Sequence, residues 1–365
     1  IEANIAKANE VYDRLLAFYN DSSIVINQNI LDHQSTIGDY YTQLDKLLDP
    51  HLGRDREKAE GWLARISDIN AKRKSDYQVY LEGEQGVWKN IDATYSLYCQ
   101  LVLDRYNYMK KADIKAVQLM SRIDQKYLTS LRQLPELLQR IAGSYYVQRI
   151  GGEAEADYRT LYFDTADLAM YTQHHNRKLH RQKLRVRTYR STLTTFFELK
   201  DKDNKGRTRK TRIPIPPQLF DNALSLPEVS DFVNSSAIFP AGLLLPQLEN
   251  SFRRITLADK GLHERVTIDC GIRFRNRLTG LAHDLSPLVV IEVKHEVGAP
   301  PSPIRQSLRD LRIPPCRISK YCIGTLLTNP DAKANRFKPK LRYINQILGQ
   351  ANIAQPQSQS INLNP

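Results

Sequence analysis

Short segments in which charged and apolar residues alternate occupy much of the chain between residues 158 and 294. Side chains two positions apart along a β-strand lie on the same face, so alternation gives a strand one charged and one apolar face. In Lys-Leu-Arg-Val-Arg at residues 183–187, the basic side chains share one face, and Leu184 and Val186 share the other. This pattern restricts the region to strands that bury one face and present cations on the opposite one.

Other segments repeat the pattern. It places together Glu198 with Lys200, Lys210 with Arg212, Arg265 with Thr267 and Asp269, and Glu292 with Lys294. A half-buried strand with its charges in water would also alternate, and for any single strand this alternative is serious. It weakens because the bias toward Arg and Lys recurs from strand to strand.

Cations that fill the interior of a small barrel need an anion, because an unpaired buried charge costs several kcal/mol. A phosphate chain meets this need. Arg matches phosphoryl oxygens in bidentate fashion, and Lys adds mobile point charges. Carboxylates on the same face, Glu292 together with Glu198, could then hold Mg²⁺ or Mn²⁺ through oxygen ligands.

The alternating segments predict a series of strands without intervening helices, which favours an antiparallel sheet over a Rossmann arrangement. Turn signals at residues 204–206 and 260–261 join neighbouring strands as hairpins. We therefore expect an α+β fold, an antiparallel β tunnel or barrel with flanking helices. The expected strands are 158–164, 182–189, 194–200, 209–215, 252–257, 264–272 and 288–294, and the expected helices are 131–141, 304–311 and 341–348.

Residues 1–110 have a helical period throughout, with breaks at residues 21–23, 49–53 and 83–86. They predict an all-α bundle or hairpin with an interaction or scaffolding role. Residues 111–350 form the expected tunnel domain. The Gln-, Ser- and Asn-rich residues 351–365 are expected to be a disordered tail.

The charge follows this division. Residues 1–110 carry 13 Lys and Arg against 17 Asp and Glu, whereas residues 111–365 carry 40 against 23. A basic excess confined to one part indicates an anionic partner such as nucleic acid, anionic lipid or a phosphate-rich ligand, unless it is only a solvated surface. Nucleic acid is not expected, because the basic strands lack the interleaved exposed aromatic residues of single-strand binders.

Composition excludes several classes of protein. No apolar run approaches the roughly 18 residues of a membrane-spanning helix, and the four cysteines form no CxxC pair. We expect a cytoplasmic protein, held at the inner face of the membrane only through a partner. Residues 1–110 could bind that membrane-protein partner or form a homo-oligomer. The numbering opens at Ile1 without Met, so the true N-terminus could be missing.

A set of motifs resembles the VTC domain, the polyphosphate polymerase domain of the triphosphate tunnel metalloenzyme superfamily, in its bacterial type. The resemblance covers about residues 111–327 and does not reach residues 1–110. The motifs, in order, are Arg122-Ile-Asp-Gln-Lys-Tyr127, Tyr158-Arg-Thr-Leu-Tyr-Phe-Asp-Thr165, Lys183-Leu-Arg-Val-Arg187, Glu198-Leu-Lys200, Asn204-Lys-Gly-Arg-Thr208, Ile291-Glu-Val-Lys294 and Ile318-Ser-Lys-Tyr321.

The resemblance implies roles for the matching positions. Glu292 would be the metal carboxylate, and Ser319 and Lys320 would bind phosphate near the end of the tunnel. The cations on the phosphates would be Lys126, Arg185, Arg187, Lys200, Lys210, Arg254, Arg265 and Lys294. Of these, Lys200, Arg185, Arg187 and Lys294 are the expected catalytic residues, and the strand faces add Lys183 and Arg212 as phosphate ligands and Glu198 as a second metal ligand.

One departure from the wider superfamily bears on activity. Its triphosphate hydrolases open with an ExExK strand, whereas Asp124-Gln-Lys126 keeps the Lys and lacks the paired Glu. Fewer carboxylates favour holding a long polyanion over activating water. We therefore expect metal-dependent synthesis of polyphosphate from ATP. A hydrolase of tripolyphosphate or nucleoside triphosphate, or a non-catalytic polyphosphate-binding module that signals through residues 1–110, stays open.

Overall fold

The computed structural model describes residues 93, 95–110, 122–205 and 207–349. The fold belongs to the compact unit Tyr98–Pro365. The helical segment expected over residues 1–110 falls almost entirely outside the described residues, and so does the expected tail at 351–365. Within the described part of the chain, no helix is both long enough and apolar enough to cross a membrane.

The unit is built on an 11-stranded sheet whose main path runs β2-β11-β9-β8-β4-β5-β6-β7. All pairs along this path are antiparallel. Beside the path, β1 pairs with β3, β3 with β8, and β10 with β9. The strands are β1 (Tyr108–Lys110), β2 (Arg122–Ser130), β3 (Tyr145–Arg149), β4 (Glu155–Asp164), β5 (Arg181–Tyr189), β6 (Thr194–Lys202), β7 (Thr208–Ile215), β8 (Leu245–Asp259), β9 (Glu264–Asn276), β10 (Ala282–Leu285) and β11 (Leu288–Glu296).

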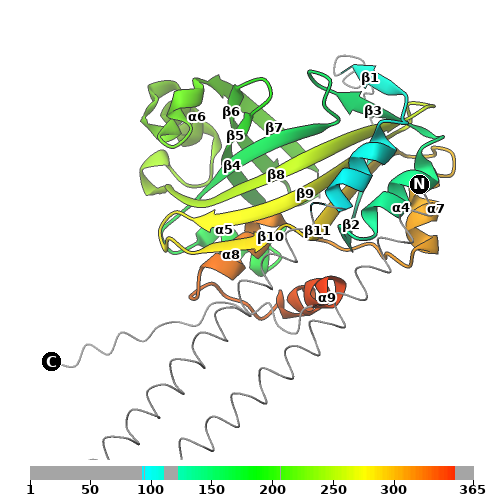
Figure 1. Ribbon diagram of the computed structural model, residues 1–365. Coiled ribbons are helices and arrows are strands. Elements are labelled where there is room, and N and C mark those ends of the chain that lie inside the picture. Colours follow the sequence, from blue (N-terminus) through cyan, green and yellow to red (C-terminus); the bar gives the residue numbers. More distant parts are fainter. Residues whose placement is uncertain (1–92, 94, 111–121, 206, 350–365) are drawn as a thin grey trace, which may run out of the picture. The chain divides into compact units, whose positions relative to one another are not determined.

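Helices flank the sheet, as Figure 1 shows. They are α4 (Leu134–Ile141), α5 (Ala169–His175), α6 (Pro227–Ser236), α7 (Pro303–Asp310), α8 (Lys320–Thr328) and α9 (Lys338–Leu348), with short 3₁₀ turns at Pro217–Leu219, Ala223–Ser225 and Ala241–Leu243. The expected α+β class with an antiparallel sheet is confirmed.

Several elements differ from the sequence prediction. Strands β1, β2, β3 and β10 and helices α5, α6 and α8 were not predicted, and α5 and α6 lie between strands that were expected to follow one another without helices. Strand β8 extends seven residues further toward the N-terminus than the predicted start at residue 252, because Pro246 and Asn250 interrupt the alternation without ending the strand. The pairing of β8 with β9 also shifts register between Ser251 and Arg253. Helix α8 was not predicted, since its residues from Tyr321 onward are all buried and show no polar face.

The strand register connects one face of the sheet from β2 to β7. Lys126 pairs with Glu292, and Glu292 pairs in turn with Thr267. We call the polar part of this continuous surface the charged face. Its residues are Asp124 and Lys126 on β2, Glu292 and Lys294 on β11, Arg265, Thr267 and Asp269 on β9, Arg254 on β8, Tyr158 and Thr160 on β4, Lys183, Arg185 and Arg187 on β5, Glu198 and Lys200 on β6, and Lys210 and Arg212 on β7.

The opposite face of β4, β5 and β6 is apolar. Leu184, Val186 and Phe197 pack there with Val229 and Val233 of α6 in one buried cluster. Burial of such side chains contributes about 1.5–3 kcal/mol each. This packing explains the alternation, since the residues between the cations form the core that holds the strands in place.

Helix α8 closes one end of the charged face. Its buried residues form a cluster with Leu248 and Phe274 of the sheet. A side chain at Gly324 would overlap both of these residues, so only glycine allows this close approach. Ser319 is the N-cap of α8 and accepts a hydrogen bond from the backbone N–H of Cys322. The packing of α8 therefore fixes Ser319 and Lys320 at the edge of the charged face.

Candidate functional site: the charged face

The charged face curves around an interior, because residues on non-adjacent strands interact across it. The carboxylate of Glu292 on β11 opposes the lowering of the Lys200 pKa on β6, although several strands separate the two residues in the sheet. The ammonium of Lys183 on β5 donates to the hydroxyl of Ser319 at 2.9 Å. These contacts bring residues from both halves of the sheet into one site, as expected of a tunnel.

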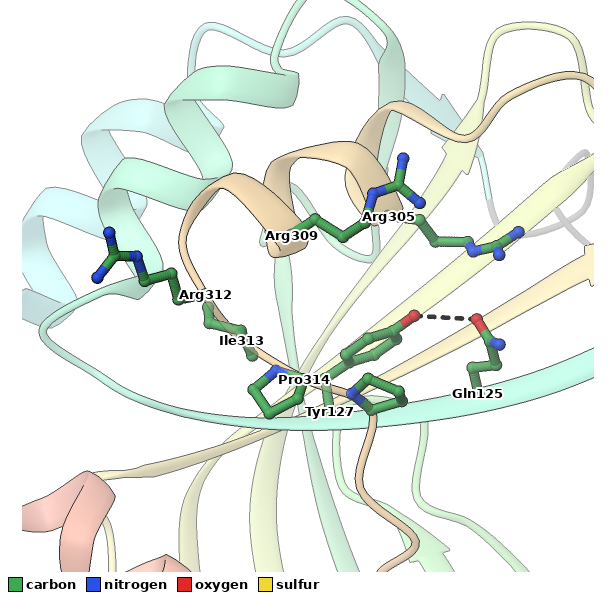
Figure 2. Close-up of a pocket in the computed structure, with 8 residues that line it drawn as sticks. Gln125, Tyr127, Arg305, Arg309, Arg312, Ile313 and Pro314 are labelled. Atoms are coloured by element: carbon green, nitrogen blue, oxygen red, sulfur yellow. Dashed lines mark hydrogen bonds between the residues drawn. The ribbon is translucent and has the colours of Figure 1, made fainter.

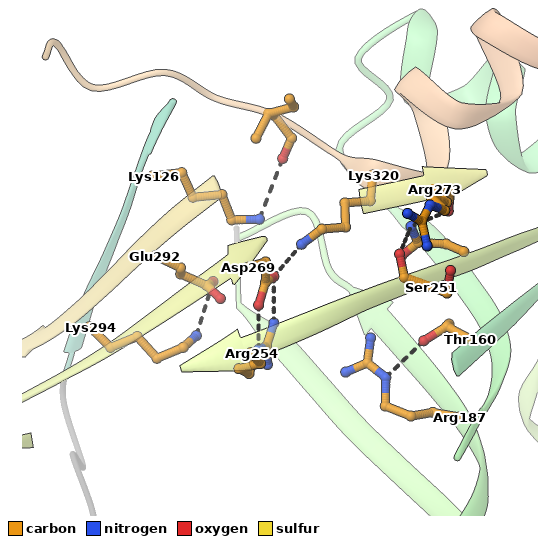
Figure 3. A network of polar contacts seen from close by, with 12 residues as sticks. Lys126, Thr160, Arg187, Ser251, Arg254, Asp269, Arg273, Glu292, Lys294 and Lys320 are labelled. Carbon is orange, nitrogen blue, oxygen red and sulfur yellow. Dashed lines mark hydrogen bonds and ion pairs between the residues drawn. The ribbon is translucent and has the colours of Figure 1, made fainter. Parts of the chain in front are cut away.

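Glu292 lies in the first cluster, on the β2–β11 wall. Lys294 Nζ is 3.1 Å from Glu292 Oε1 (Figure 3). The same ammonium is 3.0 Å from Asp124 Oδ2. Burial would raise the pKa of Glu292, but Lys126, Lys294 and Arg254 lower it to about 2. Glu292 is therefore ionised at neutral pH and keeps part of its surface exposed.

Asp269 forms the centre of the second cluster. It accepts two bonds from Arg254, Nε–Oδ1 at 2.5 Å and Nη2–Oδ2 at 2.7 Å, and Lys320 contacts the same carboxylate (Figure 3). Burial opposes ionisation of Asp269, yet the two cations hold its pKa well below the usual range. The carboxylate thus fixes Arg254 and Lys320 in position.

Glu198 holds the third cluster, on β5–β7. Its carboxylate is fully buried and lies 2.6 Å from Arg185 Nη2, while its other oxygen pairs with Lys210. Burial would raise its pKa, but Arg185, Arg187 and Lys210 lower it to about 2. Both oxygens of Glu198 are therefore engaged by cations.

Three further cations, Lys183, Arg187 and Lys200, form no ion pair with a carboxylate of the described residues. Arg187 donates through Nε to the hydroxyl of Thr160 at 3.1 Å (Figure 3). Burial and the charge of Arg185 lower the pKa of Arg187 to about 10. The pKa of Lys200 is lowered by Arg185 first and by burial second, and burial lowers the pKa of Lys183. For each of these side chains, burial and the neighbouring cations outweigh the nearby anions, so a further anion would stabilise the charged form.

Aromatic rings support the arginines. Tyr158 and Phe252 stack with ring centroids 5.1 Å apart. The guanidinium carbon of Arg254 lies 4.9 Å from the Tyr158 ring, and that of Arg187 lies 5.4 Å from it. Cations over aromatic faces are attracted by the ring quadrupole. The pair therefore restricts both arginines to orientations along the face.

The donor set fits a magnesium-type ion better than a metal held by the protein alone. Among the described residues, no three His, Cys, Asp or Glu side chains gather at one point. Mg²⁺ commonly takes one or two carboxylates and completes its shell with substrate phosphates and water. Glu292, with Asp124 beside it, offers this arrangement. Glu198, the second expected ligand, is held by Arg185 and Lys210, so this geometry favours a structural role for it.

The remaining expected residues differ in their position on the charged face. Arg212 is exposed on β7 and sits over the Phe196 ring at 4.4 Å. Arg265 is paired in register with Lys294. Lys126 Nζ is 3.4 Å from the carbonyl oxygen of Ile318. Arg212 thus lies outside the dense part of the charged face, whereas Lys126 lies within it.

Sequence reasoning missed two carboxylates and the aromatic pair as site residues. Asp269 had been placed on the right face by its period, but not given a role. Asp124 stands two positions before Lys126, so the same period could have identified it. Nothing in the local sequence of Tyr158 or Phe252 indicates that they stack, since they lie on different strands.

Comparison with known proteins identifies the region. The model of the protein family described as the VTC domain matches residues 121–329 of this chain. No match was found among curated proteins. Similar solved structures include a putative adenylate cyclase from Bacillus halodurans, with 19% identity, 55% of this chain and 94% of that chain covered, and a TM-score of 0.36.

A putative adenylyl cyclase from Hippeastrum, described as having a dominant triphosphatase activity, has 15% identity over 55% of this chain and 94% of its own, with a TM-score of 0.32. A protein from Pyrococcus horikoshii has 10% identity over 55% and 95%, with a TM-score of 0.33. The assignment rests on the sequence match, which spans more than half of the chain and contains every strand of the charged face. The chain belongs to the VTC domain family.

Proposed function

We propose that the chain synthesises inorganic polyphosphate by transferring the γ-phosphate of ATP to a growing chain held on the charged face. Membership of the VTC domain family supports an enzyme of polyphosphate or triphosphate chemistry. Members of the tunnel metalloenzyme superfamily depend on divalent metals. The choice of synthesis, of ATP and of Mn²⁺ or Mg²⁺ is the proposal.

The observation that carries the proposal is a group of neighbouring cations, one buried and two half-buried, whose pKa is lowered. Lys183, Arg187 and Lys200 lie on one face of the adjacent strands β5 and β6, and none forms an ion pair with a carboxylate of the described residues. A chain of phosphates would supply several anionic oxygens in a row. It would also stabilise the charged form of all three side chains.

The state of the carboxylates favours synthesis over hydrolysis. Hydrolysis needs a base or a metal-bound water, whereas chain growth uses a phosphate oxygen that is already anionic. Glu198 and Asp269 are each engaged by two cations, so neither can readily accept a proton from water. Glu292 and Asp124 remain, and they are better suited to hold an ion.

In the proposed reaction, a terminal phosphate oxygen of the chain attacks the γ-phosphorus of ATP. The new P–O–P bond forms as the bond to the β-phosphate oxygen breaks, and ADP leaves with that electron pair. A metal held by Glu292 and Asp124 would offset charge on the phosphoryl oxygens. Lys200, Arg185 and Arg187 would stabilise the charge dispersed over the transferred group and align the two ends.

The test is to incubate the full chain with ATP and Mn²⁺ or Mg²⁺ and to resolve products by length on a gel. A ladder of polyphosphate is expected. Orthophosphate without a ladder would replace synthesis by hydrolysis, and unchanged ATP together with tight polyphosphate binding would leave a binding module.

Lys200→Ala tests the assignment of the site. We expect it to reduce chain synthesis by at least about 100-fold, the scale of removing one group that stabilises transition-state charge. Lys260→Ala is the matched control, because Lys260 is exposed in the turn between β8 and β9. Equal synthesis by the two variants would remove Lys200 from the mechanism.

A further inference from the structure

A second cationic pocket lies on the opposite side of strand β2. Its cavity measures about 430 Å³ and is lined by Gln125, Tyr127, Arg305, Arg309, Arg312, Ile313, Pro314 and Pro315. Gln125 and Tyr127 alternate along β2 with Asp124 and Lys126, which face the interior. The pocket is therefore separate from the charged face.

The pocket offers two kinds of surface. Arg305 and Arg309 project from α7, and Figure 2 shows both side chains extending to the same side as the Tyr127 hydroxyl. That hydroxyl donates to Gln125 Oε1 at 2.9 Å. Below them, the Tyr127 ring and the side chains of residues 313–315 form an apolar wall. A ligand that used both surfaces would carry an anion at one end and a flat apolar group at the other.

Arg312, which lines the pocket, has a strained backbone conformation at the end of α7. Helix α7 ends in a Schellman motif, in which the N–H of Ile313 bonds to the carbonyl of Leu308 at 2.8 Å and the N–H of Arg312 bonds to Arg309 at 2.9 Å. The residue at the turn has a left-handed conformation, and Arg312 has φ 56°. Glycine adopts this conformation without strain. An arginine at this turn therefore costs stability relative to glycine.

We propose that this pocket binds a nucleoside phosphate, with its phosphates on Arg305 and Arg309 and its base against Tyr127 and the two prolines. The cavity falls within the usual range of roughly 300–1,000 Å³ for small-molecule sites. Guanidinium groups bind phosphoryl oxygens in bidentate fashion. A bare phosphate chain would leave the apolar wall unused, so the wall favours a nucleotide over inorganic polyphosphate.

The experiment is a calorimetric titration of ADP into the full chain at saturating tripolyphosphate, which fills the charged face. We expect one ADP to bind to the wild-type chain. Arg305→Ala and Arg309→Ala should each weaken this binding about 10- to 100-fold, the loss of a hydrogen-bonded charge. Arg140→Ala is the control, because Arg140 pairs with Glu136 in solvent on α4.

Arg312→Gly also separates binding from folding. It relieves the left-handed strain, and the Arg312 side chain lies apart from those of Arg305 and Arg309 (Figure 2), so the melting temperature should equal or exceed that of the wild type while ADP binding is unchanged. Titration of adenosine and of tripolyphosphate alone distinguishes the two surfaces, since neither uses both. The Lys200→Ala variant should bind ADP in this pocket with wild-type affinity, whether or not it synthesises polyphosphate. The ADP-binding result is therefore independent of the proposed function. Unchanged ADP affinity in Arg309→Ala, or complete displacement of ADP by tripolyphosphate, would overturn the proposal.

Discussion

Glu198 and Glu292 stand on the same face of the same sheet, in segments with the same alternating pattern, but in different surroundings. The side chain of Glu198 is 0% exposed and is enclosed by Arg185 and Lys210. That of Glu292 is 23% exposed and contacts Lys294 through Oε1. Burial opposes ionisation of both, and neighbouring cations lower both pKa values to about 2.

The comparison teaches that charge state alone does not identify a functional carboxylate. Both groups are ionised, and both have cations within reach. They differ in whether a carboxylate oxygen remains available to a ligand. Both oxygens of Glu198 form ion pairs within the protein, with Arg185 and Lys210. A carboxylate such as Glu198, with both oxygens in ion pairs, holds neighbouring strands together. A carboxylate such as Glu292, which keeps an oxygen available, can bind an ion.

The largest expected effect that tests the difference between Glu198 and Glu292 is on the rate of polyphosphate synthesis. Glu292→Gln keeps the shape of the side chain and removes its charge. We expect it to lower polyphosphate synthesis by about 10³-fold or more, since a metal contributes several kcal/mol to charge stabilisation. The measurement is the initial rate of chain growth with Mn²⁺ or Mg²⁺. A variant that kept a tenth of the wild-type rate would contradict the distinction.

Glu198→Gln should instead act on stability. Removing one partner of a buried ion pair leaves an uncompensated charge and costs about 3–5 kcal/mol. Arg185, which is almost fully buried, would be left without its partner. Urea unfolding of both variants measures the difference, and Glu292→Gln should lose less because its pair with Lys294 is partly exposed. Equal losses would mean that the two clusters share one structural role.

Much of this arrangement could be predicted from sequence. Alternation placed Lys183, Arg185, Arg187, Glu198 and Lys200 on one face, because a period of two depends only on strand geometry. The register then carries that face from strand to strand. The pairing of Glu198 with Lys210 was beyond prediction, since it depends on which residues of β6 and β7 stand opposite one another.

The rest depends on long-range packing. Helix α8 is buried on all sides, so its sequence has no amphipathic period to detect. The contact of Lys320 with Asp269 joins residues 51 positions apart in sequence. The same limit applies to Arg312, whose left-handed conformation is set by the end of α7 rather than by its own preference. Local sequence patterns predict which side chains share a face of the sheet. Tertiary contacts determine which carboxylates on that face keep an oxygen available to a ligand.

Ligand binding tests whether the cations without a carboxylate partner, rather than those in ion pairs, hold the anion. Tripolyphosphate at 100 times its Kd should stabilise the chain by about 2.7 kcal/mol, since it binds the folded state alone. Arg187→Ala should reduce this protection, because Arg187 donates to the hydroxyl of Thr160 and forms no ion pair with a carboxylate of the described residues. Thermal unfolding with and without the ligand measures it, and Arg140→Ala serves as control. Undiminished protection in Arg187→Ala would place the anion elsewhere.

The smallest effect concerns pH. The pKa of Glu198 is depressed to about 2 in the folded chain, so its contribution to stability is present above its ordinary value of about 4.5 and is lost as pH falls toward 2. The difference in unfolding free energy between wild type and Glu198→Gln should therefore shrink by about 1 kcal/mol between pH 7 and pH 3.5. Urea unfolding at both pH values measures it. The same comparison with Glu136→Gln, whose pair with Arg140 is exposed, should change much less. A difference that stayed constant for Glu198 would mean that Arg185 and Lys210 do not hold this carboxylate ionised.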